Sequence, residues 1–413
     1  MEMETARARA LKDAIDQMEY DQMFRTNTLT VPRRVVFGNY TARNVGDEAR
    51  AFEAKRILVV TGPRVAQSGL LTGLMESFRM NDMRTEVFSD VEPEPDIKTA
   101  NRIADFVRSA EFDLVCGVGG GSVMDIAKIA AVVATNPGEI RPYVGVNLIK
   151  KPGLPKILLP TTAGTASEMT PNAIIGLHDE GTKAAIISPY ILTDVAVVDP
   201  ILTLTLPRKP TAGSGLDALA HAIESYISLD ANPITSLLSL RAIELIARYL
   251  PTAFSDGANL QARSAMSLAS MMAGISIANA GTCSGHAAAY GYAAKYKIPH
   301  GFSVAVALPR ILEFSLVSCP EKAATIVEAM GLTRSCLSSD NMAIEAVLAV
   351  VRLMQEVQSP MSLSQLGIPR TEIPSIAQEM LKTKRLMAHN PRPVTESEAV
   401  EIITGMWEGN HRP

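Results

Sequence analysis

A chain of 413 residues is too long for one small core and predicts two domains of ordinary size. Its 47% hydrophobic and 20% charged residues are typical of a globular protein with ample apolar material to bury. The net charge of -4 excludes a strongly basic surface, so we expect neither nucleic acid nor a membrane as a partner.

Predicted strands and helices alternate in the first half of the chain. Residues 3–24 carry apolar positions at helical spacing, which predicts an amphipathic helix before the first strand. Short apolar runs bounded by turn residues predict strands at 30–38, 56–61, 84–88, 113–117, 154–160 and 195–198, helices at 42–53, 68–80, 96–109 and 123–134, and a hairpin from 173–177 and 183–187. Such alternation indicates a parallel, Rossmann-like sheet with helices on both faces.

The strand signal ends near Pro207, and long helical patterns follow it. The clearest cover 236–249, 260–278, 342–358 and 373–381. The sequence therefore predicts an α/β dinucleotide-binding domain over 1–206, in which 1–27 form a helical extension, and an all-α domain over 207–413. A cleft between two such domains is the expected place for an active site.

A run of glycines stands between a predicted strand and a predicted helix. Gly119, Gly120 and Gly121 allow a ligand to approach the backbone, and the helix that follows offers free N–H groups and its dipole to a pyrophosphate. The alternative is a tight turn that needs glycine only for positive φ. The order of strand, glycines and helix favours a nucleotide site over that alternative.

Polar side chains near the glycines have ordinary explanations as well as functional ones. In the ordinary explanation, Asp125 does no more than complement the helix dipole, and Lys128 is a solvated side chain. A cluster of hydroxyl groups at 161–172 follows a predicted strand. Ser and Thr are common loop and cap residues there, but they could also bind phosphate, ribose or nicotinamide.

Three of the 6 histidines lie with an aspartate in the stretch 213–301. Asp217 and His221 are four residues apart in a segment without proline, so on a helix both side chains point the same way. Such pairs are also common on protein surfaces and at helix N-termini. Together with His286 and His300, however, they would suit Fe, Zn, Ni or Co better than Ca or Mg, which prefer oxygen ligands.

Several motifs, in the right order, resemble those of the iron-containing (group III) alcohol dehydrogenases. They are GGGSVMDIAK at 119–128, TTAGTASE at 161–168, GLDALAHAIE at 215–224, and GHA and IPHG around the last two histidines of that stretch. The resemblance implies the dehydroquinate synthase-like fold of that family. It also implies a divalent metal, with Fe(II) favoured by the family name and Zn(II) as an alternative, held by Asp217, His221, His286 and His300.

The same resemblance implies NAD or NADP as the cofactor. It assigns cofactor binding to Gly119, Gly120, Gly121, Ser122, Asp125, Thr161, Thr162, Thr165 and, near the ribose, Lys183. Many members also carry an aspartate after the strand at 56–61, where a carboxylate repels the 2'-phosphate of NADP. Gly62 occupies this cofactor-binding place here, with Arg64 nearby, so we expect NADP to be accepted alongside NAD.

A second departure from the family pattern lies four residues after the third proposed ligand. Many members have a histidine there, whereas this chain has Tyr290. The phenol could form part of the cavity wall or act as a general acid or base. We favour the wall, because a phenol with a pKa of about 10 needs a strong perturbation to act as a base at neutral pH.

Together these features predict a metal-dependent NAD(P)-linked oxidoreductase that interconverts a small alcohol and its aldehyde or ketone by direct hydride transfer. A reductase of a short acidic aldehyde, such as a semialdehyde or a sulfonated aldehyde, is an alternative. A sugar-phosphate cyclase of the dehydroquinate synthase type would need more basic residues than the stretch at 213–301 offers. A non-catalytic nucleotide-binding protein would not explain why the four ligands and the glycine run occur together.

The cysteines and the N-terminal segment bear on the compartment. Cys116, Cys283, Cys319 and Cys336 are scattered without a Cys-x-x-Cys pair, and residues 1–25 lack the apolar run of a secretory signal. We therefore expect a reducing compartment and a cytoplasmic protein. We also expect a homo-oligomer, in its simplest form a homodimer.

Overall fold

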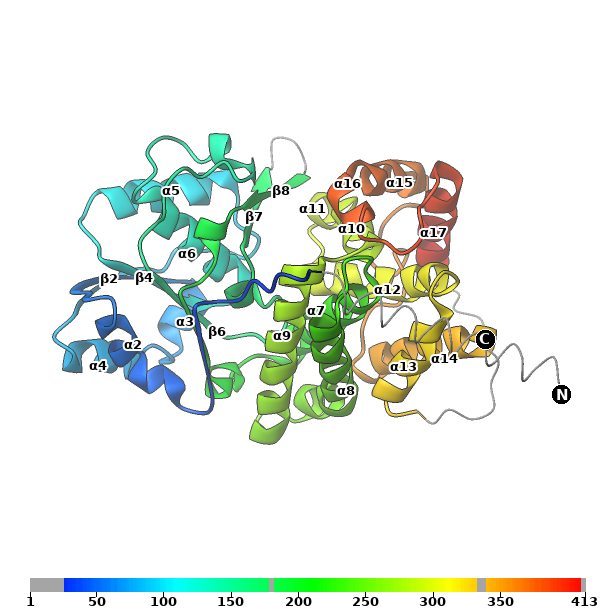
Figure 1. Ribbon diagram of the computed structural model, residues 1–413, viewed down its shortest axis with the longest axis horizontal. Helices are drawn as coiled ribbons and strands as arrows, with labels where there is room; N and C mark the ends of the chain where they lie inside the picture. Colours follow the sequence, from blue (N-terminus) through cyan, green and yellow to red (C-terminus); the bar gives the residue numbers. More distant parts are fainter. Residues whose placement is uncertain (1–25, 178–181, 333–338, 410–413) are drawn as a thin grey trace.

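The computed structural model describes residues 26–177, 182–332 and 339–409, and it shows an α/β half beside a helical half (Figure 1). The helix expected at 3–24 and Cys336 lie outside the described residues. Within them, six parallel strands form the main sheet in the order β1-β9-β6-β4-β2-β3. Their bounds are β1 Arg34–Phe37, β2 Arg56–Thr61, β3 Arg84–Phe88, β4 Leu114–Gly119, β6 Lys156–Pro160 and β9 Val195–Val198.

The central strands are apolar because helices cover both faces of the main sheet. On β2, Leu58 and Val60 belong to one core, whereas Ile57 and Val59 belong to the core on the opposite face. The predicted parallel sheet with helices on both faces is confirmed. The covering helices are α2 Val45–Arg50, α3 Pro63–Gln67, α4 Thr72–Met80, α5 Ile97–Arg108 and α6 Gly121–Val133.

A smaller sheet stands beside the main one, with the order β5-β8-β7. The predicted hairpin is confirmed, since β7 (Asn172–Leu177) pairs antiparallel with β8 (Thr182–Ile187). The connecting residues 178–181 lie outside the described part of the chain. The short strand β5 (Gly145–Val146) was not predicted, because two residues carry no periodic signal.

Several predicted element bounds differ from the observed ones. The helix expected at 68–80 begins only at Thr72, as α4, because Gly69 adopts a left-handed φ of 79° before it; the short helix α3, which precedes Gly69, was not predicted. The helix expected at 42–53 begins as a 3-10 turn, η1 (Thr41–Asn44), and continues as the short α2. The strand expected at 30–38 pairs only over β1.

The glycine run joins the end of β4 to the start of α6. Gly119 ends the strand, Gly120 is the N-cap residue and Gly121 is the first helical residue. Positive φ is absent from all three, so the interpretation as a turn that requires it is wrong. Their small size matters instead: a Cβ atom on Gly119 would lie 2.6 Å from the Val123 side chain, and one on Gly121 would lie 2.7 Å from Thr165 Oγ1.

The helical half begins with α7, which is buried along nearly its whole length and packs against α8, α9 and α12. No further strand follows β9 among the described residues, as predicted. None of the helices described is long and apolar enough to cross a membrane. The helices are α7 Arg208–Ile227, α8 Pro233–Ser255, α9 Leu260–Ala280, α10 Ser284–Tyr290, α11 Ala293–Tyr296, α12 His300–Leu316, α13 Pro320–Ala329, α14 Ser339–Glu356, α15 Ile373–Lys382, α16 Lys384–Met387 and α17 Glu396–Glu408.

A buried ion pair attaches α6 to β7 and to the segment that precedes it. Lys128 is fully buried, so its interpretation as a solvated side chain is wrong. Its Nζ donates to Ser167 Oγ at 2.8 Å and to the Asn172 carbonyl at 2.7 Å. The Asp125 carboxylate accepts from Ser167 Oγ at 2.5 Å and from the Ile174 backbone N–H at 3.0 Å. Burial lowers the pKa of Lys128 to about 8, because its effect exceeds the opposing effect of the nearby Asp125 carboxylate.

The Lys128→Met variant should lower the free energy of unfolding by about 3 to 5 kcal/mol, because Asp125 would lose the cation 3.7 Å away while it stays buried. Urea unfolding followed by tryptophan fluorescence measures this loss. The exposed Lys98 on α5 provides the control, and Lys98→Met should change the free energy by less than about 0.5 kcal/mol. Equal unfolding midpoints for the two variants would contradict the role assigned to the pair.

Candidate active site

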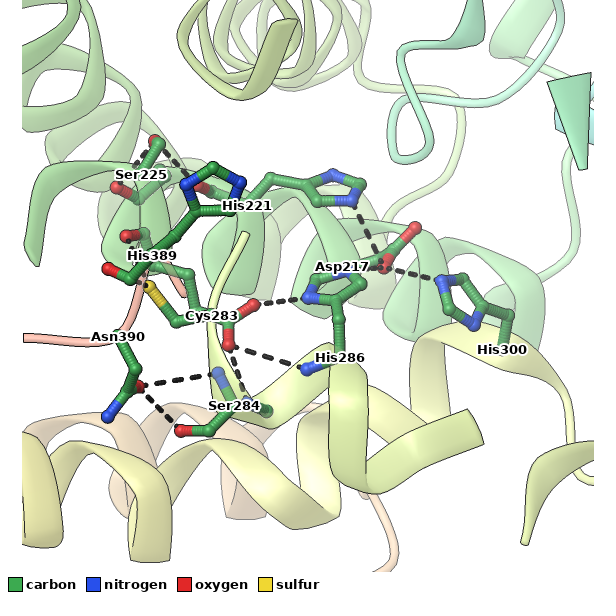
Figure 2. Close-up of polar contacts among 12 residues, drawn as sticks. Asp217, His221, Ser225, Cys283, Ser284, His286, His300, His389 and Asn390 are labelled. Atoms are coloured by element: carbon green, nitrogen blue, oxygen red, sulfur yellow. Dashed lines mark hydrogen bonds and ion pairs between the residues drawn. The ribbon is translucent and has the colours of Figure 1, made fainter. Parts of the chain in front are cut away.

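The four side chains predicted as metal ligands converge on one point (Figure 2). α7 carries Asp217 and His221, α10 carries His286, and α12 begins at His300. Asp217 Oδ1 lies 3.8 Å from the Nε2 atoms of His221 and His286. It lies 3.7 Å from His300 Nε2. These separations are too long for hydrogen bonds, but they approach the distance of about 3.4 Å between ligand atoms that lie about 2.1 Å from a tetrahedral ion.

Three polar atoms in this cluster are buried without a hydrogen-bond partner among the described residues. They are Asp217 Oδ1, His286 Nε2 and His300 Nδ1. An unpaired buried polar atom is costly, and a bound cation is a common reason for such an atom; here it applies to Asp217 Oδ1 and His286 Nε2, which face each other, and not to His300 Nδ1, because His300 approaches Asp217 through Nε2. Ligand atoms of Asp217, His221 and His286 all lie within 4.8 Å of one another. One carboxylate and three imidazoles therefore fit a divalent cation of the iron or zinc type.

A backbone carbonyl from the α/β half orients His221. The ring Nδ1 lies 3.3 Å from the carbonyl oxygen of Gly164, in the loop after β6. If Nδ1 donates to that oxygen, Nε2 keeps its lone pair for the cluster. Gly164 can approach α7 because it has no side chain: a Cβ atom there would lie 2.7 Å from the Ser214 backbone oxygen.

A buried carboxylate that was not predicted as a site residue orients His286. Glu224 is fully buried on α7 and accepts a hydrogen bond from His286 Nδ1 and another, at 2.7 Å, from the Gly285 N–H. A signal for it was available in the sequence. Glu224 follows His221 by one helical turn and Asp217 by two, so it lies on the same face of an otherwise apolar helix.

Burial and mutual charge shift the pKa values of the cluster. Burial acts to raise the pKa of Asp217, but His221, His300 and His286 together more than offset this and hold it well below the usual range. Burial lowers the pKa of His221 despite Asp217, and it lowers that of His300 to about 3. Burial also acts to lower the pKa of His286, but the carboxylates of Glu224 and Asp217 together outweigh it and raise this pKa to about 9. A cation would therefore displace a proton from His286.

The cluster and the last glycine of the run, Gly121, line the same cavity, which has a volume of about 980 Å³. The predicted cofactor residues that contribute to its wall are Gly121, Ser122, Asp125, Thr165 and Lys183. The other predicted ones lie outside the wall, at the carboxyl ends of β2, β4 and β6: Gly62, Gly119, Gly120, Thr161 and Thr162. The wall therefore combines both halves of the molecule.

Other polar residues of the cavity wall were not among the predicted cofactor residues. Ser167 and Thr170, from the hydroxyl cluster noted at 161–172, line the cavity, as does Asn172, the first residue of β7. Lys183 on β8 forms an ion pair with Glu94, in which Nζ lies 2.6 Å from Oε2. Nothing local in the sequence indicates this pair, because the two residues belong to separate loops and strands.

Gly62 has a steric reason for being glycine. It is the N-cap residue of α3 with an ordinary φ of -103°. A Cβ atom there would lie 2.9 Å from the carbonyl oxygen of Val91. A carboxylate introduced by Gly62→Asp would therefore move the backbone as well as add charge, and the variant would not isolate the effect of charge on cofactor choice.

Tyr290, at the end of α10, contributes to the cavity wall. Burial raises the pKa of its phenol, which makes the phenolate still less available near neutral pH. This direction agrees with the expectation that Tyr290 is a wall residue. Its catalytic role stays a prediction.

Comparisons with known proteins agree with the geometry. The family model described as "Iron-containing alcohol dehydrogenase" matches residues 32–200. The one described as "Fe-containing alcohol dehydrogenase family, C-terminal" matches residues 211–407. Long-chain-alcohol dehydrogenase 1 of Geobacillus thermodenitrificans is 39% identical over 88% of this chain and 92% of its own length.

Solved structures are similar along almost the whole chain. A 1,3-propanediol oxidoreductase is 34% identical with a TM-score of 0.90, and the match covers 93% of this chain and 100% of that one. A sulfoacetaldehyde reductase of Bifidobacterium kashiwanohense in complex with NAD+ is 28% identical with a TM-score of 0.82, and the match covers 92% and 99% of the two chains. The chain therefore belongs to the iron-containing alcohol dehydrogenase family and is an oxidoreductase of that family.

Proposed function

We propose that this chain interconverts an alcohol and its aldehyde or ketone with NAD or NADP and a divalent metal in the cavity between its two halves. The observation that carries the proposal is the position of Asp217 Oδ1, which three imidazole nitrogens surround without a hydrogen bond. The N-terminus of α6 opens into the same cavity. Similarity to dehydrogenases and reductases along most of the chain supports the proposal.

Asp217, His221, His286 and His300 would hold the metal, with Fe(II) favoured by the family name and Zn(II) suited to the same donors. A cation bound there supplies Lewis-acid chemistry, which lowers the pKa of an alcohol and polarises a carbonyl. The Gly164 carbonyl and the Glu224 carboxylate would keep two of the imidazoles in the tautomer and orientation that this requires.

The N-terminus of α6 would hold the pyrophosphate of the cofactor. Gly120 has no capping side chain, so the first N–H groups of the helix are available to an anion. We propose cofactor contacts for the residues predicted from the sequence, namely Gly62, Gly119, Gly120, Gly121, Ser122, Asp125, Thr161, Thr162, Thr165 and Lys183. The nicotinamide supplies or accepts the hydride. Because Gly62 brings no carboxylate to the end of β2, we propose that NADP is accepted as well as NAD.

The compartment and the assembly are further parts of the proposal. Cys116, Cys283 and Cys319 are buried free thiols, which supports a cytoplasmic location. β1 is an edge strand of the described sheet with Val35 and Phe37 exposed, which supports association into a homo-oligomer such as a homodimer.

One assay tests the proposed function directly. Metal-loaded protein is mixed with NADH or NADPH and a panel of aldehydes, and the absorbance of the reduced nicotinamide is followed. Alcohols with NAD+ or NADP+ test the reverse direction. Consumption of reduced cofactor in proportion to aldehyde supports the proposal. A sugar-phosphate cyclase would leave the amount of reduced cofactor unchanged, and turnover of that kind would contradict the proposal.

The His221→Ala variant should lose bound metal and activity together while it keeps the far-ultraviolet circular dichroism of the wild type. Mass spectrometry of the metal content measures the first effect. His389→Ala is the matched control. His389 is not one of the proposed ligands, and its Nδ1 forms a hydrogen bond with Asp230, 2.8 Å long. Full activity of the wild type after thorough chelation would rule out the metal.

The Glu224→Gln variant should bind Zn²⁺ about 10- to 100-fold more weakly than the wild type, because His286 would lose the carboxylate that orients it. Calorimetry on the metal-free protein measures the dissociation constant without reference to catalysis. Glu244→Gln is the control, because Glu244 forms an exposed pair with Arg241 on α8. An unchanged dissociation constant would show that Glu224 does not position His286 for a metal.

The Tyr290→Phe variant should lower the rate of hydride transfer by less than about tenfold, or roughly 1.4 kcal/mol, if Tyr290 is a wall residue. Single-turnover kinetics measure this rate, and the variant is compared with the wild type at equal metal content. A loss on the order of 100-fold or more would instead make the phenol a general acid or base.

A further inference from the structure

Basic side chains of the cavity wall differ in whether a carboxylate neutralises them. Lys183 pairs with Glu94 at 2.6 Å, as described above. Lys295 pairs with Glu372, with 2.5 Å between Nζ and Oε2. Both pairs leave the wall locally neutral.

The wall has two other basic residues, Lys297 and Arg385, whose side chains form no hydrogen bond or ion pair with any described residue. Both side chains are exposed. Their charges are therefore available to a ligand that enters the cavity.

The two unpaired cations lie on the half of the molecule that carries the proposed metal ligands. Lys297 stands three residues before His300 and has a left-handed φ of 52° at the end of α11. Arg385 lies on α16, which packs against α10, the helix of His286 and Tyr290. The α6 N-terminus, where the cofactor phosphates are proposed to bind, belongs to the opposite half. These two cations are thus placed for the substrate rather than for the pyrophosphate.

No carboxylate of the described wall is free to neutralise Lys297 and Arg385. Glu94 is engaged by Lys183. Asp125 accepts hydrogen bonds from Ser167 and from the backbone of β7, and Asp217 faces the three imidazoles. The substrate side of the cavity therefore carries uncompensated positive charge in addition to any metal.

We propose, on the basis of the proposed function, that the substrate carries a carboxylate or a sulfonate, which Arg385 and Lys297 bind while its carbonyl or hydroxyl end faces the ligand cluster. The planar guanidinium of Arg385 matches either anion with two parallel hydrogen bonds, and Lys297 adds a compact charge. The anionic group takes no part in the reaction: a hydride adds to the carbonyl carbon and a proton to its oxygen. Because both cations are exposed, each contact should change specificity by on the order of tenfold or less.

The test compares anionic with neutral aldehydes of matched size on the metal-loaded wild type with NADH. Succinic semialdehyde is compared with butyraldehyde, and sulfoacetaldehyde with propionaldehyde, so that the two pairs distinguish a carboxylate from a sulfonate. At least one anionic aldehyde should have a kcat/KM about tenfold or more above its neutral partner, and rising salt should reduce the difference. A preference for the neutral member of both pairs would overturn the proposal.

Variants assign the preference to particular residues. Arg385→Met and Lys297→Met should each reduce the ratio of anionic to neutral kcat/KM by on the order of three- to tenfold, mainly through KM, and the double variant should abolish the preference. Lys295→Met is the matched control, because Glu372 already neutralises Lys295 in the same wall. A ratio in the double variant equal to that of the wild type would overturn the proposal.

A binding measurement separates this inference from the proposed function. Calorimetry with 4-hydroxybutanoate and with 1-butanol on the metal-loaded protein reports on the anion site without turnover. If no aldehyde is reduced but the wild type binds 4-hydroxybutanoate and the double variant does not, the proposed function fails and the anion site stands. If aldehydes are reduced while wild type and double variant bind 4-hydroxybutanoate equally, the anion site fails and the proposed function stands.

Discussion

The buried carboxylate of Asp217, with three imidazole nitrogens around one of its oxygens, is the constraint on which the structure depends. An oxygen left without a hydrogen bond in a buried place costs free energy unless a cation neutralises it. The helical half is arranged to meet that constraint. α7 is enclosed on nearly all sides, and α10 and α12 each bring one imidazole to the face of α7 that carries the carboxylate.

Support for the cluster comes from both halves of the molecule. Glu224 holds His286 from within α7, whereas the Gly164 carbonyl reaches His221 from the loop that follows β6. Gly164 can do so only because it has no side chain to contact Ser214. The loop that contributes to the nucleotide side of the cavity therefore also orients an imidazole of the cluster. A displacement between the two halves would change the metal geometry and the cofactor wall together.

Predictions from the sequence were correct where a local pattern decides the bounds of an element. They were wrong or missing where packing between elements decides whether a side chain is buried. β2 and β9 were predicted at their observed bounds, because both are apolar runs closed by turn residues. A solvated Lys128 was one interpretation of the sequence, since a lysine on a helix is usually exposed, but Ser167 and the first residue of β7 cover it and supply acceptors. Glu224 was overlooked for the same reason: a helical glutamate is ordinarily on the surface, and only α10 makes it a buried partner of His286.

By itself, the sequence determined the alternation of strands and helices, the glycine run at a strand–helix junction, and the shared direction of Asp217 and His221, because each follows from the period of one element. Motif order was enough to indicate the family, which the comparisons confirmed. Only the tertiary structure decided that His286 and His300 meet that pair, and that Arg385 lacks a carboxylate partner within the part of the chain that the structure describes. Distances between elements depend on how their buried faces pack, and the spacing of residues along one chain does not specify them.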